Sequence, residues 1–278
     1  MPETPDLVVI ARYLQEHVVG RTIVSARELR PLALRLLAPA ADANAFCAGQ
    51  PITAATTKAK FLLLTLGEGR YLVINFMLAG ALRHCPAAEP LRKRDYVVFS
   101  LDDGTELRYH DPKGMGKVYL CTDLADVPGL LTTSPDALDP ALTLDVFRER
   151  LRPLRGEIKG VLTRGALVGG IGNAYADEIL FRAGIYPFRR STTLSPDEVA
   201  ALYAAMRAVL NEAIAVLGER MSEPGGGEID VKIRDFLAVH NKRGQPCPRC
   251  GQPISEVKSG QRATNFCRHC QPGTLIRQ

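Results

Sequence analysis

The first apolar pattern of the chain has the spacing of a helix. Leu7, Ile10, Leu14 and Val18 recur every three or four residues, which places them on one face of an α-helix. The segment before them reads Thr4-Pro5-Asp6. A threonine hydroxyl can cap a helix, proline suits its first turn, and an acid favours the positive end of the helix dipole. We therefore expect a helix that starts at Thr4 with a hydroxyl cap and docks through its apolar face.

Between about residues 21 and 121 the pattern changes to short apolar runs separated by turn residues. Gly67-Glu68-Gly69 and Asp102-Asp103-Gly104 have the composition of hairpin turns. Apolar runs joined by such short turns favour an antiparallel sandwich or barrel. The strands expected on this basis cover residues 61–66, 71–76, 96–101 and 106–110.

The second half of the chain has a helical pattern. Residues 122–135 are rich in turn formers and are expected to be a linker, and residues 136–220 are expected to be helical. The motif Ser195-Pro196-Asp197-Glu198 is a capping box with proline at the first helical position, so a long helix should begin there and run to about Leu217. Three consecutive glycines within residues 221–227 predict a mobile loop.

Composition narrows the class of protein without defining it. The chain has 278 residues, 46% of them hydrophobic, and a net charge of +5. The length suits two domains and a small appendage, and the basic excess is compatible with a nucleic-acid partner. Neither a transmembrane run nor a signal peptide is apparent in the sequence. We therefore expect a cytosolic protein that does not enter a membrane.

The seven cysteines divide into a C-terminal group of four and three scattered thiols. Cys247 and Cys250 form one C-x-x-C pair, and Cys267 and Cys270 form a second. Each pair can place two sulfurs on one side of a tetrahedron, so the spacing predicts one structural zinc site with four thiolate ligands. The segment is too short to bury much apolar surface, and metal binding would supply its folding free energy. The scattered thiols indicate a reducing compartment.

The N-terminus offers a candidate nucleophile. Proline at position 2 permits removal of Met1, which would expose the secondary amine of Pro2. Such an amine can attack an aldehyde-like carbon and form an iminium, and the N-terminus of a helix lowers the pKa of the amine. Glu3 is placed beside it to transfer protons. Judged from Pro2 alone, an ordinary processed terminus is the commoner outcome.

A glycine-rich turn at residues 169–172 leads directly into a helical segment near Asn173. Glycine lets a backbone approach a ligand closely, and the free N–H groups of a helix favour an anion. One interpretation is a phosphate clamp in which Asn173 is the cap or a side-chain donor, and the alternative is an ordinary tight turn between helices. Lys60, Lys159 and Arg262 are further phosphate-contact candidates, although residues of these types are more often solvated surface charges.

Together these motifs resemble the bacterial formamidopyrimidine-DNA glycosylase and endonuclease VIII family. The similarity runs in order from Pro2-Glu3, through Lys60 and residues 170–185, to the cysteine pairs and Arg262. It covers essentially the whole chain. The resemblance implies an α+β protein with the following domains: an N-terminal antiparallel β-sandwich catalytic domain (1–132), a helix–two-turn–helix DNA-binding domain (133–238) and a zinc finger with a β-hairpin (239–278).

The resemblance also implies an activity. Members of the family flip a damaged nucleotide out of double-stranded DNA. The nitrogen of Pro2 would attack C1′ and displace the base, and Glu3 would protonate the sugar ring oxygen. Elimination from the resulting Schiff base would then cut the strand on both sides. Lys60 and Arg262 would hold phosphates around the reacting nucleotide. The implied protein is a monomeric, bifunctional glycosylase and abasic-site lyase of base excision repair, associated with the bacterial nucleoid.

Further residues are placed at the DNA by the same resemblance. Asn173, with Gly172 and Tyr175 of its motif, would contact the phosphate backbone, and Lys159 matches a lysine near the lesion. These assignments follow the family's motifs position by position. They extend the expected DNA interface into the helical domain.

Several positions depart from the family's usual residues. Leu78 stands where methionine usually fills the gap left by the flipped base, and Lys113 and Met115 stand where arginine and phenylalanine act as wedges. Further along, Arg164 and Gly165 replace an acid and a glutamine. The lesion class is expected to be oxidised purines, and the changed wedge predicts altered lesion and opposite-base choice.

Other interpretations compete with the bifunctional enzyme. One is a non-catalytic damaged-DNA-binding member of the same family, and another is a glycosylase for oxidised pyrimidines or abasic sites. A third is a zinc-ribbon protein associated with RNA or translation. Pro2 and Glu3 favour an enzyme because a pure binder needs neither, and the match over residues 170–178 disfavours the RNA-associated protein.

Overall fold

A computed structural model shows the chain as two compact units. The first unit comprises residues 1–132 and 214–233, and the second comprises residues 133–213 and 234–278. The division of the chain into three domains, with the finger separate from the helices, stays a prediction. The structure describes residues 1–131, 134–221, 227–229, 234–260 and 262–273.

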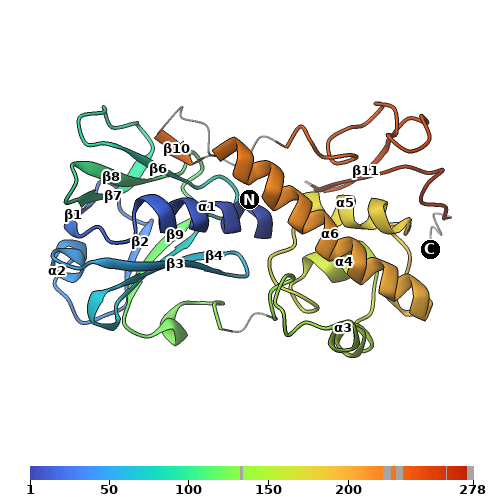
Figure 1. The fold of residues 1–278 in the computed structure, drawn as a ribbon, viewed down its shortest axis with the longest axis horizontal. Helices are drawn as coiled ribbons and strands as arrows, with labels where there is room; N and C mark the ends of the chain where they lie inside the picture. The colour runs from blue at the N-terminus through green and yellow to red at the C-terminus, as the bar shows by residue number, and fades with distance from the viewer. Residues whose placement is uncertain (132–133, 222–226, 230–233, 261, 274–278) are drawn as a thin grey trace. The chain divides into compact units, whose positions relative to one another are not determined.

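The first unit is built on two five-stranded sheets (Figure 1). Its strands are β1 Ile23–Glu28, β2 Leu34–Leu36, β3 Ile52–Lys58, β4 Phe61–Leu66, β5 Tyr71–Asn75, β6 Ala81–Pro86, β7 Asp95–Leu101, β8 Thr105–His110, β9 Lys117–Cys121 and β10 Gly227–Ile229. One sheet has the order β1-β7-β8-β6-β10, and the other has the order β2-β9-β5-β4-β3. The antiparallel sandwich is confirmed, with one parallel pair, β2–β9, that the turn pattern did not predict.

The four strands expected from the sequence are confirmed as β4, β5, β7 and β8. Gly67–Gly69 forms the short turn between β4 and β5, and residues 102–104 connect β7 to β8. In β4, Leu62 and Leu64 are buried on one face, while Phe61 and Leu63 pack on the other. Burial on both faces explains why this strand is a continuous apolar run rather than an alternating one.

The segment expected to be a linker covers part of that sheet. Val127 and Leu130 are buried and pack against Phe61 and Leu63 of β4. A short 3-10 turn, Leu124–Asp126, precedes them. The linker prediction is therefore wrong for the residues up to 131, which contribute to the core of the first unit.

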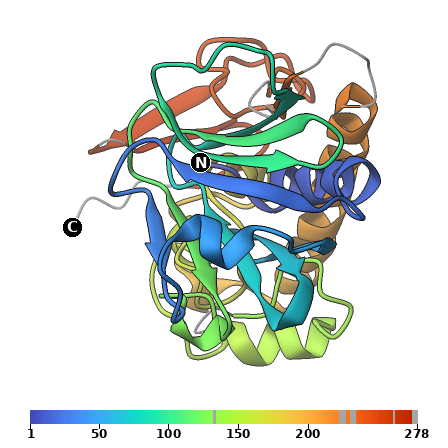
Figure 2. The same cartoon turned by 90° about the vertical axis from the view of Figure 1, so that its left-hand side faces the viewer.

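The N-terminal helix α1 (Thr4–His17) is confirmed, but its cap is not the one expected. The N-cap is Glu3, whose backbone N–H donates to Asp6 Oδ2 at 2.7 Å. Thr4 is the first helical residue, and its hydroxyl is buried inside the unit rather than capping the helix. The apolar face, with Leu7 and Leu14 fully buried, packs against β3. Figure 2 shows the strands and α1 of this unit from a second side.

The second unit contains α3 (Leu144–Leu151), α4 (Ile158–Thr163), α5 (Asn173–Ala183) and the first part of α6 (Pro196–Met221). The capping box of α6 is confirmed, because Glu198 N–H donates to Ser195 Oγ at 3.2 Å and Ser195 N–H donates to Glu198 at 2.8 Å. The remaining helix, α2 (Ala43–Cys47), belongs to the first unit. The loop expected at residues 221–227 lies largely outside the described residues.

Helix α6 corrects the expectation that the sequence contains no run long and apolar enough to cross a membrane. Its 26 residues include a window with a mean hydropathy of 1.5, which is long and apolar enough to cross a membrane by composition alone. However, 44% of that window is buried, and Leu202, Met206 and Leu210 lie in the core of the second unit. The core helix of a globular unit has the same properties, so these values do not assign α6 to a membrane.

The C-terminal hairpin also belongs to the second unit. Strands β11 (Ser255–Ser259) and β12 (Arg262–Phe266) pair antiparallel, and β12 packs against α5. A small apolar cluster beside the hairpin includes Phe181 of α5 together with Ile254 and Cys267. The expected β-hairpin is confirmed, and α5 is its support.

Candidate active site, DNA interface and zinc centre

The start of the chain is held at the mouth of α1. Pro2 is buried, and Glu3, the N-cap of α1, is only 3% exposed. The terminal ammonium of Met1 donates to the carbonyl of Leu78 at 3.2 Å. A group at this position lies next to the positive end of the α1 dipole, which favours the unprotonated form of an amine. The structure thus brings Pro2, Glu3 and the turn of Leu78 together.

Lys60 lies in the tight turn between β3 and β4. Lys58 pairs with Phe61 across the turn, and only Ala59 and Lys60 lie between them. Ala59 has a left-handed backbone, with φ of 51°, which is a conformation that tight hairpins require. The turn therefore fixes the backbone position of Lys60, whose side chain is half-buried. The predicted phosphate contact of Lys60 stays a prediction.

The three wedge candidates lie on two turns of the first unit. Leu78 is 47% exposed and Met115 is 43% exposed, and Lys113 is exposed as well. Large apolar side chains at such exposure are available to a partner. The loop that carries Lys113 is organised by Asp111, whose two carboxylate oxygens accept from Lys113 N–H at 2.9 Å and Gly116 N–H at 2.8 Å. The sequence analysis gave Asp111 no such role.

Asn173 is a side-chain donor rather than a cap. Gly172 is the N-cap of α5, and Asn173 is the first helical residue. The amide nitrogen of Asn173 donates to the carbonyl of Ala263 in β12 at 2.9 Å. Of the two roles weighed for Asn173, the structure therefore has the second, and its observed acceptor is the hairpin backbone. Contacts of Gly172 and Asn173 with phosphate stay predictions.

Lys159 is buried against the same strand. Its ammonium lies 2.7 Å from Asp177 Oδ1 and donates to Ala263 O and Thr264 Oγ1, both at 3.0 Å. Only 8% of Lys159 is exposed. A cation this deep requires a counter-charge, and Asp177 supplies it. In this structure Lys159 anchors the hairpin to α4 and α5, and its predicted DNA contact is untested.

Two acids of α5, Asp177 and Glu178, tie the following segment to the helix. Asp177 Oδ2 accepts from Asn265 N–H at 3.2 Å and lies 2.8 Å from His240 Nδ1. Glu178 accepts from the backbone N–H groups of residues 238–240 at 2.8–2.9 Å. Burial raises the pKa of Glu178, and these three donors oppose that effect. Two adjacent acids between the apolar residues Ala176 and Ile179 are a sequence signal that could have indicated this role.

The other two DNA-interface candidates in the second unit differ in exposure. Tyr175 is fully buried in the core, with the guanidinium carbon of Arg234 5.3 Å from its ring centroid. Arg262 is exposed at the start of β12. Arg262 is therefore available for a phosphate, whereas Tyr175 lies in the hydrophobic core of the second unit. Neither DNA contact is tested by the structure.

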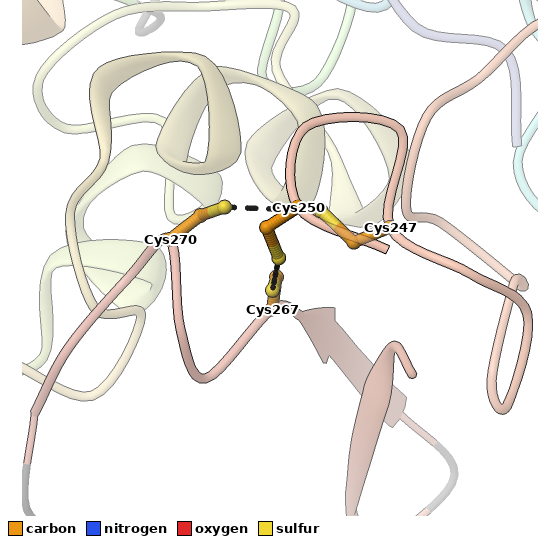
Figure 3. Close-up of side chains that lie close together, drawn as sticks. All are labelled: Cys247, Cys250, Cys267 and Cys270. Carbon is orange, nitrogen blue, oxygen red and sulfur yellow. Dashed lines mark hydrogen bonds between the residues drawn. The ribbon is translucent and has the colours of Figure 1, made fainter. Parts of the chain in front are cut away.

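The four C-terminal cysteines converge as the spacing predicted (Figure 3). Their sulfurs all lie within 4.8 Å of one another, with Cys247–Cys270 at 3.8 Å and Cys250–Cys267 at 3.5 Å. Four sulfurs about 2.3 Å from a tetrahedral zinc ion are about 3.8 Å apart. The thiol set therefore fits one zinc ion. Burial opposes ionisation of Cys247, but the backbone N–H groups of Arg249 and Cys250 lower its pKa to about 7.

Comparison with known families agrees with this architecture. The family model of the formamidopyrimidine-DNA glycosylase N-terminal domain matches residues 1–118, that of its H2TH domain matches residues 133–223, and the zinc finger found in FPG and IleRS matches residues 244–273. A formamidopyrimidine-DNA glycosylase of Symbiobacterium thermophilum is 39% identical over 275 residues, which cover 98% of this chain and 90% of that protein.

Solved structures show the same similarity. Lactococcus lactis Fpg in complex with DNA containing an abasic site has a TM-score of 0.87 at 26% identity, over 98% of this chain and 100% of that one. MutM (Fpg) from Thermus thermophilus has a TM-score of 0.83 at 31% identity, over 99% of this chain and 100% of that one. The sandwich, the helical unit and the four-cysteine hairpin define a DNA glycosylase with a zinc finger. This chain belongs to the formamidopyrimidine-DNA glycosylase family.

Freshly purified protein is expected to contain one zinc ion per chain by metal analysis. Four thiolates complete the coordination and leave no open position for water, so the zinc is structural. Cys250→Ser removes one ligand and should release most of the metal and weaken DNA binding, because the hairpin with Arg262 is attached to the same segment. Cys121→Ala removes a thiol outside the cluster and should keep the zinc. Purified parent protein without zinc would contradict the assignment.

Proposed function

We propose that this protein is a bifunctional DNA glycosylase and abasic-site lyase that excises oxidised bases, mainly purines, from double-stranded DNA. The observation that carries the proposal is the placement of Pro2, buried immediately before the N-cap of α1, in a chain of this family. Structures of the Lactococcus lactis relative contain DNA with an abasic site in one case and with Fapy-dG in another, which supports the substrate class. We place its action in the cytosol, as a monomer on DNA.

The reaction begins with the amine of Pro2 after Met1 has been removed. The amine attacks C1′ of the flipped nucleotide, and the glycosidic bond breaks with its electron pair leaving on the base. Glu3, as a general acid, protonates the sugar ring oxygen as the ring opens to the iminium. The iminium acidifies the C2′ proton, so its removal expels the 3′ phosphate. A second elimination expels the 5′ phosphate.

Pro2 and Glu3 suit these roles for separate reasons. A secondary amine gives a cationic iminium when the sugar ring opens after loss of the base, and the dipole of α1 favours the neutral amine. Glu3 is held at the start of α1 by a capping box with Asp6, in which the Glu3 N–H donates to Asp6 Oδ2 and the Glu3 carboxyl accepts from the Asp6 N–H. The zinc ion takes no part in the reaction, because its four thiolate ligands leave no open position. Its role in this scheme is to hold the hairpin that carries Arg262.

The proposal is tested by borohydride trapping on a panel of duplexes. The protein is incubated with DNA containing an oxidised purine, an oxidised pyrimidine or a preformed abasic site, and the covalent adducts are resolved by electrophoresis. We expect the abasic site and the oxidised purine to trap in high yield. Tight binding to the damaged duplexes without any adduct would identify a non-catalytic damage binder instead. Adducts on the pyrimidine lesion only would change the lesion class.

Lys113 predicts a relaxed choice of the base opposite the lesion. An arginine fork can contact a base edge with two hydrogen bonds, worth about 1–3 kcal/mol of discrimination, whereas lysine is a single point charge. We expect excision opposite cytosine to exceed excision opposite adenine by about tenfold or less. Lys113→Arg should raise that ratio by about fivefold or more. Lys117→Arg is the matched control, because Lys117 lies in β9 and donates to Leu32 O at 2.9 Å.

The measurement is the excision rate of one oxidised purine placed opposite each of the four bases. A parent protein that almost refuses adenine would show that Lys113, or another residue, discriminates as an arginine does. An unchanged ratio in Lys113→Arg would show that the loop is not where the opposite base is recognised.

A further inference from the structure

Two exposed apolar side chains of the first unit stand on different turns. Leu78 belongs to the turn between β5 and β6, and Met115 belongs to the loop between β8 and β9. They are about equally exposed, at 47% and 43%. By contrast, Phe76 and Gly116, which lie near them in the same two turns, are buried. Each turn thus has buried residues at its base and one exposed apolar side chain.

The hydroxyl of Tyr109 lies at the base of both turns. Tyr109 is fully buried. A Cβ added to Gly80 would lie 2.6 Å from the Tyr109 hydroxyl, and one added to Gly116 would lie closer still. Real side chains do not approach so closely, so both positions accept only glycine while the hydroxyl is there. The same Cβ on Gly116 would lie 2.8 Å from Asn75 O, so the Met115 loop also packs against the last residue of β5, which leads into the turn of Leu78.

The hydroxyl is also bonded to the acid that organises the Met115 loop. Tyr109 donates to Asp111 Oδ2 at 3.3 Å, and the same oxygen accepts from Gly116 N–H at 2.8 Å. Asp111 is fully buried. Burial, followed by the charge of Asp111, raises the pKa of Tyr109 far above its usual value. The hydroxyl therefore remains protonated, and able to donate, at neutral pH.

The turn of Leu78 is itself constrained. Met77 has a left-handed backbone, with φ of 47°, and its N–H donates to Asn75 Oδ1 at 3.1 Å. Gly80 N–H donates to Phe76 O at 2.9 Å and closes the turn. A non-glycine residue holds such a conformation only where its surroundings impose it. Leu78 is therefore carried by a rigid turn whose base is set against Tyr109.

We propose that Tyr109 is a positioning residue that fixes Leu78 and Met115 relative to each other, so that the two side chains enter the DNA as one unit. The inference rests on the proposed function, in which both side chains fill the space left by the flipped base. Two side chains held at a fixed distance from each other can fill the space left by the flipped base together, and loss of either one leaves the other poorly placed. A tyrosine that served only as core packing would need its ring and not its hydroxyl.

The test is a double-mutant cycle of Leu78→Ala and Met115→Ala, made in the parent and in Tyr109→Phe. The measured quantity is kcat/KM for excision of an oxidised purine. In the parent, we expect each single change to cost nearly as much as the double change, so that the double variant is at least about fivefold faster than the product of the single effects predicts. In Tyr109→Phe, the effects should multiply to within about twofold. Thermal melting checks that every variant is folded.

Tyr96→Phe is the matched control. Tyr96 is also buried, and its hydroxyl would lie 2.6 Å from a Cβ on Gly114, in the same loop as Met115. Among the described glycines, the contacts of the Tyr96 hydroxyl are with that loop alone and not with Gly80. The coupling between Leu78 and Met115 should therefore survive in Tyr96→Phe. Its loss there to the same degree as in Tyr109→Phe would overturn a specific role for Tyr109.

A second readout separates this inference from the proposed function. 2-Aminopurine placed next to a stable abasic analogue reports by its fluorescence whether side chains enter the stack, without any catalysis. If excision fails on every lesion but the fluorescence shows coupling that Tyr109→Phe removes, the proposed activity is wrong and the positioning role stands. If the coupling persists in Tyr109→Phe by both readouts, or if neither alanine change has an effect, the positioning role is overturned.

Discussion

Protein that retains Met1 is expected to form at most about one hundredth of the borohydride adduct formed by the processed protein on an abasic site. With Met1 in place, the nitrogen of Pro2 is an amide whose lone pair is delocalised into the carbonyl, and it cannot attack C1′. The free amine is then displaced by one residue, about 3.8 Å, from the position beside Glu3. A displacement of that size costs about a hundredfold or more in a positioned reaction.

Pro2→Gly is the milder form of the same test. After removal of Met1, this variant keeps a terminal amine at the correct position, but the amine is primary and lacks the rigid proline ring. We expect a fall of about tenfold or more in excision of an oxidised purine, and a smaller fall in cleavage at a preformed abasic site. Pro5→Gly changes a proline in the first turn of α1 whose nitrogen is never an amine, and it should trap normally. Full trapping by the Met1-retaining protein would show that Pro2 is not the nucleophile.

Local patterns were sufficient for most elements of the first unit but not for its long-range pairing. The strands on either side of Gly67–Gly69 followed from apolar runs and turn residues, and both are present. The parallel pairing of β2 with β9 joins Leu34 to Val118, and no local pattern encodes a partner so far along the chain. Thr4 was expected to cap α1 because a hydroxyl precedes proline. The N–H of Glu3 bonds instead to Asp6, an acid whose presence in the first turn had been noted only for its charge.

The candidate site likewise combines features that local sequence predicts with features that depend on tertiary packing. The cysteine pairs were predictable because each C-x-x-C fixes the distance between its own two sulfurs, and the two pairs then need one common ion. Lys159 was identified as a candidate by resemblance, yet its partners are decided by tertiary packing, which brings Asp177 and Thr264 to its ammonium. The hydroxyl of Tyr109 could not be linked to Gly80 from the sequence, because that contact depends on the pairing of β6, which begins directly after Gly80, with β8.

The pair formed by Lys159 and Asp177 leads to the largest expected change in stability. The side chain of Asp177 is fully buried, that of Lys159 is 10% exposed, and the two charged groups are 2.7 Å apart. Each charge has been taken out of water, so removing one leaves the other buried without compensation. That loss costs about 3–5 kcal/mol, whereas replacing both charges by apolar groups is often close to neutral.

Asp177→Ala is therefore expected to lower the free energy of unfolding of the second unit by about 3–5 kcal/mol. With a denaturant slope of about 2 kcal/mol per molar urea, the midpoint should fall by about 1.5–2.5 M. Release of zinc to a chromophoric chelator during urea unfolding reports on this unit, because the four cysteines belong to it. Asp177→Ala combined with Lys159→Met should recover at least half of the loss.

The matched control is Asp145→Ala. Asp145 also pairs with a cation, Arg148 at 3.2 Å, but its side chain is 86% exposed, and a pair in water contributes little to stability. Its zinc-release midpoint should equal that of the parent. If Asp177→Ala and Asp145→Ala release zinc at the same urea concentration, the buried pair does not hold the hairpin to α5. In that case the attachment would rest on the other contacts of α5, namely the Asn173 bond to Ala263 O, the apolar packing of Phe181 and the three backbone donors to Glu178, and Glu178→Gln would become the variant with the larger loss.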